Sequence, residues 1–157
     1  FKLLYYLDFM HFRETGRSVT NLDYFAWNYG PVPKKLFEEM ERPSADLKES
    51  IVILPANNEK TFVELKPKKK FDDKYFTKRE LRILEKVAFI FRDAEAKDMV
   101  EASHLPNHPW DKTIKTKGEC AQIDYTLALD ETEGSLSLKE VIERIKEKKE
   151  LKKVFNE

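Results

Sequence analysis

The sequence predicts a mainly α-helical protein with one small β-hairpin, a compact single-domain bundle of about five to seven helices spanning residues 1–157. Three observations support this prediction. The length of 157 residues is typical of one domain. Only four residues are glycine, and hydrophobic residues make up 41% of the chain, which favours helices around a real core. Apolar side chains recur at helical spacing in most segments.

The first segment, residues 1–14, is predicted to form an amphipathic helix that ends near Gly16. Its expected apolar stripe has helical spacing and consists of Leu3, Leu4, Leu7, Met10 and His11. Because the stripe is already present at Leu3, we expect the helix to begin upstream of Phe1 and N-terminal residues to be missing.

An aromatic segment, residues 22–29, is predicted to be a short strand or an extended buried segment. Gly30–Pro33 interrupts this segment, and its prolines suit the approach to a helix at residues 33–41. We expect the apolar face of that helix to consist of Leu36, Phe37 and Met40.

A β-hairpin is predicted by the two β-branched runs at residues 51–54 and 61–65. Residues 42–50 before it are expected to be a polar connection. A lone two-stranded hairpin is only marginally stable in water, so we expect this one to lie against the helices.

Two capping boxes predict the starts of two later helices. In the first, Thr77 is the N-cap and Glu80 is the third helical residue. The apolar face expected to follow consists of Leu84, Val87, Ala88 and Phe91. In the second box, Ser137 and Glu140 begin a final helix, whose charged stretch at residues 146–153 is expected to be exposed.

Between these helices the local signals are weaker. Asp93 is expected to cap a helix at about residues 94–103. Residues 103–110 are predicted to form a loop, because Pro106 and Pro109 both oppose a continued helix.

The next two segments are polar and ambiguous. Residues 111–122 are polar and carry no predicted element. Residues 123–130 alternate like a strand, although Asp124 could equally cap a short helix.

Charge and composition exclude several classes of protein. Lys plus Arg and Asp plus Glu number 29 each, and a net charge of zero argues against a dedicated nucleic-acid binder. The basic cluster Lys66–Lys70 could touch DNA, but Asp72 and Asp73 follow it, so we interpret it as a solvated loop. A single cysteine, Cys120, makes no intrachain disulfide, and no apolar run approaches the ~20 residues of a membrane span. We therefore expect a cytoplasmic protein.

Few residues indicate catalysis or metal binding. The only histidines are His11, His104 and His108, and Pro106 separates the two that are close in sequence. The four glycines are scattered and form no phosphate-binding loop. We expect no metal and no cofactor, and we expect that the protein is not an enzyme. The remaining enzymatic alternative uses His104 with Cys120 or with a carboxylate.

Two segments join a tryptophan to prolines, at residues 26–32 and 103–110. They have two interpretations. Trp27 and Trp110 could fill the core while the prolines fix the turns. Alternatively, these aromatic residues could anchor a protein partner, since Trp and Tyr are favoured at interfaces.

A family resemblance lies in three motifs: KLLYYLDFMHFRETGR at Lys2–Arg17, AWNYGPV at Ala26–Val32, and SH with PW at Ser103–Trp110. Each is weak alone, but their order and spacing are specific. Together they make the chain resemble the Panacea domain, the family of SocA-like antitoxins and phage-associated GepA-like proteins. The signature positions that match are Lys2, Leu3, Leu4, Tyr5, Gly16, Trp27, Gly30, Pro31, Val32, Ser103, His104, Pro109 and Trp110.

The resemblance implies a helical domain from bacteria or their phages that neutralises a partner toxin by direct contact. It also implies an alternative, an adaptor that delivers a client protein to a protease, for which the C-terminal helix is a candidate second surface. A short helix at residues 123–130 is a further implication. The candidate binding residues are Tyr24, Phe25, Trp27, Tyr29, His104, His108 and Trp110.

Overall fold

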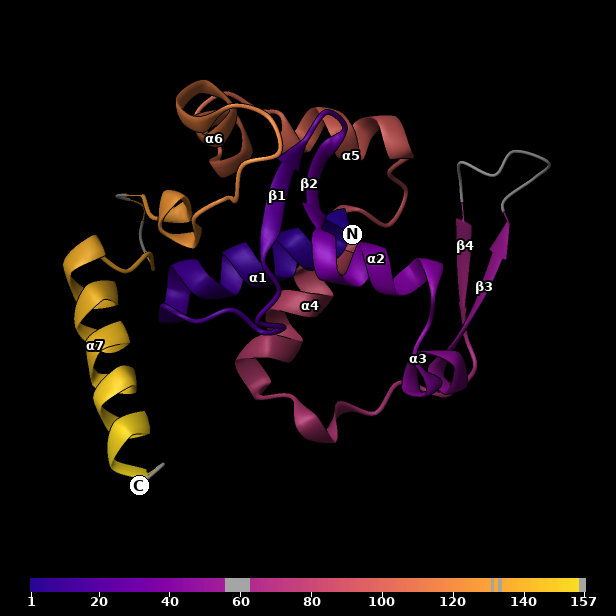
Figure 1. The fold of residues 1–157 in the computed structure, drawn as a ribbon, viewed down its shortest axis with the longest axis horizontal. Helices are drawn as coiled ribbons and strands as arrows, with labels where there is room; N and C mark the ends of the chain where they lie inside the picture. The colour runs from indigo at the N-terminus through magenta and orange to yellow at the C-terminus, as the bar shows by residue number, and fades with distance from the viewer. Residues whose placement is uncertain (56–62, 131, 133, 156–157) are drawn as a thin grey trace.

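A computed structural model describes residues 1–55, 63–130, 132 and 134–155 (Figure 1). Within these residues the chain forms seven α-helices, two short 3-10 helices and two antiparallel strand pairs, which confirms the prediction of a mainly helical fold. In chain order the elements are α1 (Lys2–Thr15), β1 (Tyr24–Trp27), β2 (Gly30–Pro33), α2 (Lys34–Glu41), α3 (Ala45–Ser50), β3 (Ile51–Pro55), β4 (Val63–Pro67), η1 (Asp73–Tyr75), α4 (Lys78–Ile90), α5 (Ala96–Ser103), α6 (Pro109–Lys117), η2 (Tyr125–Ala128) and α7 (Leu138–Phe155).

Helix α1 lies at the centre of the fold, where it packs against α4, η2 and β2. It ends as predicted at Gly16, which adopts a left-handed conformation with φ of 71°. The predicted apolar stripe is only partly right, because Leu3 is 49% exposed. The residues of α1 that are buried are Tyr5, Leu7, Asp8, Phe9, His11, Phe12 and Thr15. The helix is covered from several sides, so its buried surface is wider than one stripe.

The core has two parts, and α1 contributes to both. The first joins α1 to β1 and consists of Tyr5, Phe9, Tyr24, Ala26 and Ile123. The second joins α1 to α4 and consists of Leu7, Ile83 and Val87. Aromatic rings dominate the first part, where Phe9 stacks on Tyr125 with ring centroids 4.4 Å apart.

A buried carboxylate fixes the chain that leads from α1 to β1. Asp8 is fully buried and accepts hydrogen bonds from the backbone N–H groups of Val19 and Thr20, each at 2.8 Å. The hydroxyl groups of Thr20 and Tyr24 also donate to it, the latter at 2.8 Å. Because a buried charge is tolerated only when it is fully hydrogen-bonded, these contacts define one position for the segment.

Strand β1 was predicted as a strand or extended segment and is a strand. It pairs with β2, which we expected to be only an interruption, so the chain contains a second hairpin. On its other side, β1 exchanges backbone hydrogen bonds with Cys120, Ala121 and Ile123. Strand β2 is therefore an edge strand, and its prolines, which donate no hydrogen bond, are tolerated there.

Helix α4 begins with the predicted capping box, in which Thr77 N–H donates to Glu80 and Glu80 N–H donates to the Thr77 hydroxyl. The next helix corrects a prediction. Asp93 does not cap α5, because the helix begins only at Ala96; the Asp93 carboxylate pairs with the Arg92 guanidinium at 3.0 Å. Glu95 is the N-cap instead, and its N–H donates to Asp98.

The hairpin of β3 and β4 is confirmed, while the intervening residues 56–62 lie outside the described part of the chain. The predicted polar connection before it contains α3, capped by Ser44. Of the helices, β3 contacts chiefly α3, so the hairpin lies beside this short helix and not against the larger ones. In Figure 1 the hairpin stands away from α1 and α4.

Helix α6 was not predicted, because Pro109 suggested only a loop. Proline is well accommodated in the first turn of a helix, and Pro109 is the first residue of α6. The helix shows little apolar periodicity, since its inward side chains include Thr113. The short helix implied at residues 123–130 is confirmed as η2, and Asp124 accepts a hydrogen bond from Thr126 N–H.

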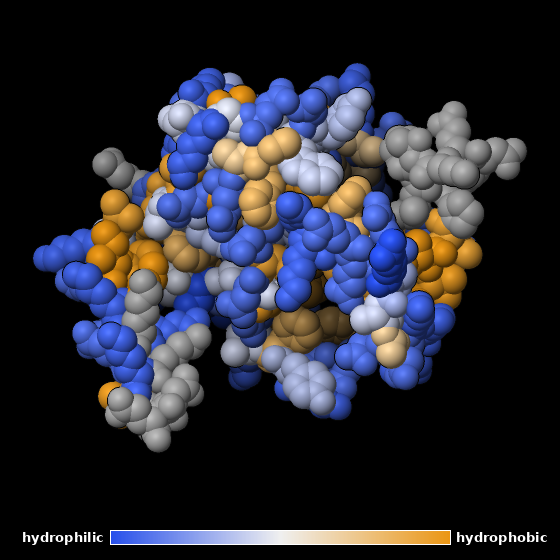
Figure 2. Space-filling view, in the orientation of Figure 1, coloured by the Kyte–Doolittle hydropathy of each residue, from blue (hydrophilic) through white to orange (hydrophobic). Residues whose placement is uncertain are grey.

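Helix α7 begins at the second predicted capping box and attaches to the end of α1. Val141 is fully buried, and the Arg144 guanidinium donates to the backbone oxygen of Thr15 at 2.9 Å. Beyond this contact α7 extends away from the other helices (Figure 1). On the face seen in Figure 2, apolar residues gather over the first turns of α7 and over the β3–β4 hairpin.

Among the described residues, no helix is long and apolar enough to span a bilayer.

Candidate functional site

The three sequence motifs meet where the β1–β2 turn contacts the end of α5 and the start of α1. Gly30 has a φ of 110°, and a Cβ at this position would lie 2.6 Å from Ser103 Oγ and 2.9 Å from Lys2 Cε. Ser103 is 1% exposed and donates a hydrogen bond to Val100 O. Only glycine allows this close approach, so these signature residues form a structural junction.

A second junction links the start of α6 to β1. The indole N–H of Trp110 donates to the backbone oxygen of Trp27 at 3.0 Å. His104 also belongs to this junction, because its ring stacks on that of Trp110 with centroids 3.7 Å apart and an interplanar angle of 16°. Trp27 contacts Phe37 of α2 edge-on at 5.0 Å. Both tryptophans therefore stabilise the packing of neighbouring elements, and both remain partly exposed.

His104 has the surroundings of a packed aromatic ring. Burial, followed by the nearby positive charge of Lys2, lowers the pKa of His104 below its usual value. Its Nε2 atom is buried and has no hydrogen-bond partner in the described part of the protein. No described carboxylate makes a hydrogen bond or ion pair with His104, and no described group of three His, Cys, Asp or Glu residues could hold a metal.

The other expected contact residues separate into buried and exposed positions. Tyr24 is completely buried, and its hydroxyl donates to Asp8, so the expectation that it is exposed for binding is wrong. Phe25 is half-buried beside Gln122. Tyr29, in the β1–β2 turn, is 79% exposed. His108 is exposed and lines a groove beside the start of α6.

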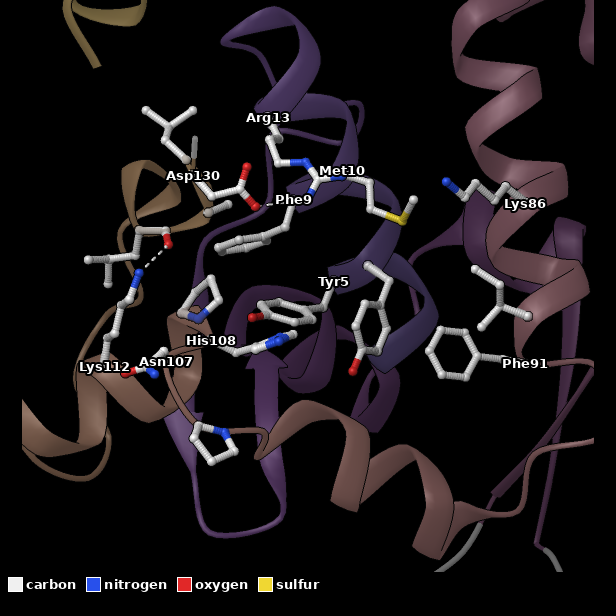
Figure 3. A pocket seen from close by; sticks show the side chains of 17 residues that line it. Tyr5, Phe9, Met10, Arg13, Lys86, Phe91, Asn107, His108, Lys112 and Asp130 are labelled. Atoms are coloured by element: carbon white, nitrogen blue, oxygen red, sulfur yellow. Dashed lines mark hydrogen bonds and ion pairs between the residues drawn. The ribbon is translucent and has the colours of Figure 1, made fainter. Parts of the chain in front are cut away.

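That groove, here called the aromatic groove, has a volume of about 530 Å³. It lies between α1, the end of α4, the turn at residues 106–108, the start of α6 and residues 127–130 (Figure 3). Tyr5 and Phe9 are 3% and 5% exposed and form its floor. Tyr6 and Phe91 form an aromatic pair along one wall, with ring centroids 4.6 Å apart. Open, aromatic-lined depressions of this size are typical binding sites.

Basic side chains surround this apolar floor. Arg13 pairs with Asp130 at 3.2 Å, and Lys112 Nζ donates to Leu127 O at 3.3 Å, so both hold the wall formed by residues 127–130. Lys86 extends from α4 toward Met10 (Figure 3). It makes no ion pair with any residue in the described ranges.

Tyr6 contributes an unusual hydroxyl to this region. The hydroxyl is buried and without a hydrogen-bond partner among the described residues. Burial raises the pKa of Tyr6 to about 12, so the phenol stays protonated at physiological pH. Its neighbour Tyr5 also has a raised pKa, mainly because of burial.

Sequence reasoning missed most of the groove. It did not single out Arg13, Lys86 or Phe9 as site residues, because only the packing of α1 against α4 brings Lys86 beside Phe9 and Arg13. One signal was available at Lys86. It lies three residues after Ile83 and four before Ile90, so it is a charged residue next to apolar ones on the same side of α4.

Taken together, these features define a small, mainly helical fold with a packed aromatic junction next to an open, partly basic groove. Residues 1–111 match the family model described as antitoxin SocA-like, Panacea domain, and the chain belongs to this family. No curated protein and no solved structure gives a significant match. The matched region ends in the first turn of α6, so η2 and α7 lie outside it. Membership supports an antitoxin-like role with a protein partner.

Proposed function

We propose that this protein is an antitoxin that neutralises a partner toxin by direct protein–protein contact. The observation that carries the proposal is the aromatic groove, which opens on the surface of a domain belonging to an antitoxin family. In this proposal the junctions around Gly30 and Trp110 are scaffold that holds the 106–109 segment in position. The groove and its surroundings make the contact.

The surface near the groove has side chains suited to such a contact. Ile90 is 53% exposed at the groove, and the preceding Phe89 is 73% exposed. Leu105, which precedes Pro106 of the groove, adds exposed apolar area. A stable interface buries roughly 800 Å² on each partner around a few such anchors, so the contact extends beyond the groove itself.

Co-expression tests the proposal. The product of the neighbouring reading frame is expressed in a bacterial host with and without this chain, and growth is measured. We expect the neighbour to stop growth alone and growth to return when both proteins are present. If no neighbouring product is toxic, or if toxicity persists with this chain, the antitoxin proposal is wrong.

One observation favours a second candidate, an adaptor that delivers a client to a protease. An adaptor needs two separate surfaces, and α7 provides a second one, because Leu151 and Val154 are 55% and 69% exposed on its distal half. Degradation of the partner by a purified protease is measured with and without this chain. Faster degradation with the chain supports the adaptor, whereas unchanged degradation with full neutralisation supports simple occlusion.

A further inference from the structure

We propose that the aromatic groove binds an amphipathic helix of the partner, with apolar residues facing Tyr5 and Phe9 and carboxylates facing Lys86. The inference rests on the proposed function for one point, that the partner is a protein. The kind of segment follows from the shape and charge of the groove.

The apolar part of the proposal comes from the floor and walls. Tyr5, Tyr6, Phe9 and Phe91 present ring surface to the groove. Met10 lies beside them and is half-buried, and its flexible thioether side chain adapts to the shape of an incoming apolar residue. A volume of about 530 Å³ accommodates several side chains from one segment but not a folded domain.

The acidic part of the proposal comes from the charges. Three cations, Arg13, Lys86 and Lys112, line the groove, against one carboxylate, Asp130. This local excess contrasts with the zero net charge of the whole chain. Because Arg13 and Lys112 already contact the 127–130 segment, Lys86 is the cation best placed to pair with an incoming carboxylate. Such complementarity selects among partners and raises the association rate.

The helical part of the proposal comes from the elements around the groove. Every residue that lines it belongs to a helix or a loop, so an extended segment would find no strand edge to join there. Grooves between helices typically accept the apolar face of another helix, which presents anchors three, four and seven residues apart. The strands lie elsewhere, in the β1–β2 and β3–β4 hairpins.

The first test uses the full chain and two synthetic amphipathic helices with identical Leu and Phe residues. One carries Glu beside the apolar face, and the other carries Lys at the same positions. Binding is measured by fluorescence anisotropy. We expect the Glu peptide to bind at least about tenfold more tightly than the Lys peptide. Equal affinities, or no binding of the Glu peptide at millimolar concentration, would overturn the inference.

Variants locate the binding. Lys86→Glu should weaken the Glu peptide about tenfold and narrow or reverse the preference for it. Ile90→Asp should weaken both peptides, and since Ile90 is 53% exposed the fold should tolerate it. Lys35→Glu is the matched control, because Lys35 is exposed on α2, outside the groove, and should leave both affinities within about twofold. If all three variants bind like the wild type, the groove is not the site.

The same variants separate this inference from the proposed function. If the toxin is neutralised equally by wild type, Lys86→Glu and Ile90→Asp, the groove inference fails while the antitoxin proposal stands. If no toxin exists but the Glu peptide binds with the expected variant effects, the antitoxin proposal fails and the groove inference stands. A concentration-dependent dimer that Ile90→Asp abolishes would assign the groove to a second copy of this chain and overturn the inference.

Discussion

The centre of this protein and its periphery are stabilised in different ways. Around α1, residues far apart in the sequence fit closely, as in the contacts of Asp8 with Tyr24 and of Gly30 with Ser103. The β3–β4 hairpin, the loop before α7 and, apart from the contacts of Val141 and Arg144 with the end of α1, α7 itself are held mainly by local features, such as strand pairing and the capping box at the start of α7. The comparison teaches that the centre fixes the geometry of the groove, while the periphery can change without disturbing it.

Two glycines test this difference most strongly. At Gly30, an alanine Cβ would meet Ser103 and Lys2, so Gly30→Ala should lower the free energy of unfolding by about 2–4 kcal/mol. Gly134, in the loop before α7, also has a positive φ, of 85°, but among the described residues no atom beyond its chain neighbours lies within 4 Å of an added Cβ. Gly134→Ala should therefore cost only about 1 kcal/mol. Urea unfolding measures both values, and equal losses would contradict the contrast between centre and periphery.

Within the centre, two tyrosine variants test whether a buried hydroxyl stabilises the protein only when it has a hydrogen-bond partner. Tyr24→Phe removes a hydroxyl that donates to the buried Asp8 carboxylate and should cost about 1–3 kcal/mol in unfolding free energy. Tyr6→Phe removes a buried hydroxyl without a described partner and should leave stability unchanged or raise it. Thermal and urea unfolding of the two variants test this. A clear loss in Tyr6→Phe would show that the Tyr6 hydroxyl has a partner after all.

Removing the N-cap hydroxyl of α4 or of α7 compares how strongly each helix is coupled to the global stability of the protein. Thr77→Ala and Ser137→Ala each remove a capping hydroxyl, worth about 1 kcal/mol. Helix α4 contributes Ile83 and Val87 to the core, so Thr77→Ala should lower the global unfolding free energy. Ser137→Ala should instead act mainly on amide hydrogen exchange within α7 and lower global stability less than Thr77→Ala, because only the first turns of α7, at Val141 and Arg144, contact the centre. Equal changes in global stability would mean that α7 unfolds together with the centre.

The smallest expected effect is the contribution of His104 to the pH dependence of the unfolding free energy. Burial lowers its folded-state pKa, so the unfolded chain binds the proton more readily. The stability associated with neutral His104 is therefore complete above the unfolded pKa of about 6.5 and decreases as the pH falls toward the folded value. His104→Phe keeps a ring on Trp110 and removes the titration. Between pH 8 and pH 5 this variant should lose less stability than the wild type, and an identical loss would contradict the assignment.

The same contrast explains which parts of the fold could be predicted from sequence. The capping boxes at Thr77 and Ser137 and the β-branched runs of β3 and β4 are local signals, and each predicted its element correctly. Strand β2 and helix α6 escaped prediction because their prolines were read as interruptions. Strand β2 is held by pairing with β1, and α6 is held by the hydrogen bond from Trp110 to Trp27. Both contacts are tertiary, so local sequence signals do not reveal them.

The candidate site also contains residues that the sequence indicated and residues that it did not. The resemblance pointed to Gly30, Ser103 and Trp110, which the fold brings to adjoining junctions. It did not reveal the groove, because the lining residues come from four separate segments, and their convergence depends on how α1, α4 and α6 pack. Tyr24 looked like a surface anchor because nothing local showed its bond to Asp8, sixteen residues earlier.

Stoichiometry tests the central claim, neutralisation by contact, most directly. A fixed amount of the purified toxin is titrated with this chain, and residual toxin activity is measured before and after the two proteins are separated. Neutralisation by contact predicts that inhibition is complete only when the chain is at least equimolar and that activity returns on separation. Inactivation by a small fraction of an equivalent, persisting after the chain is removed, would show that the chain acts as a catalyst and would contradict the account.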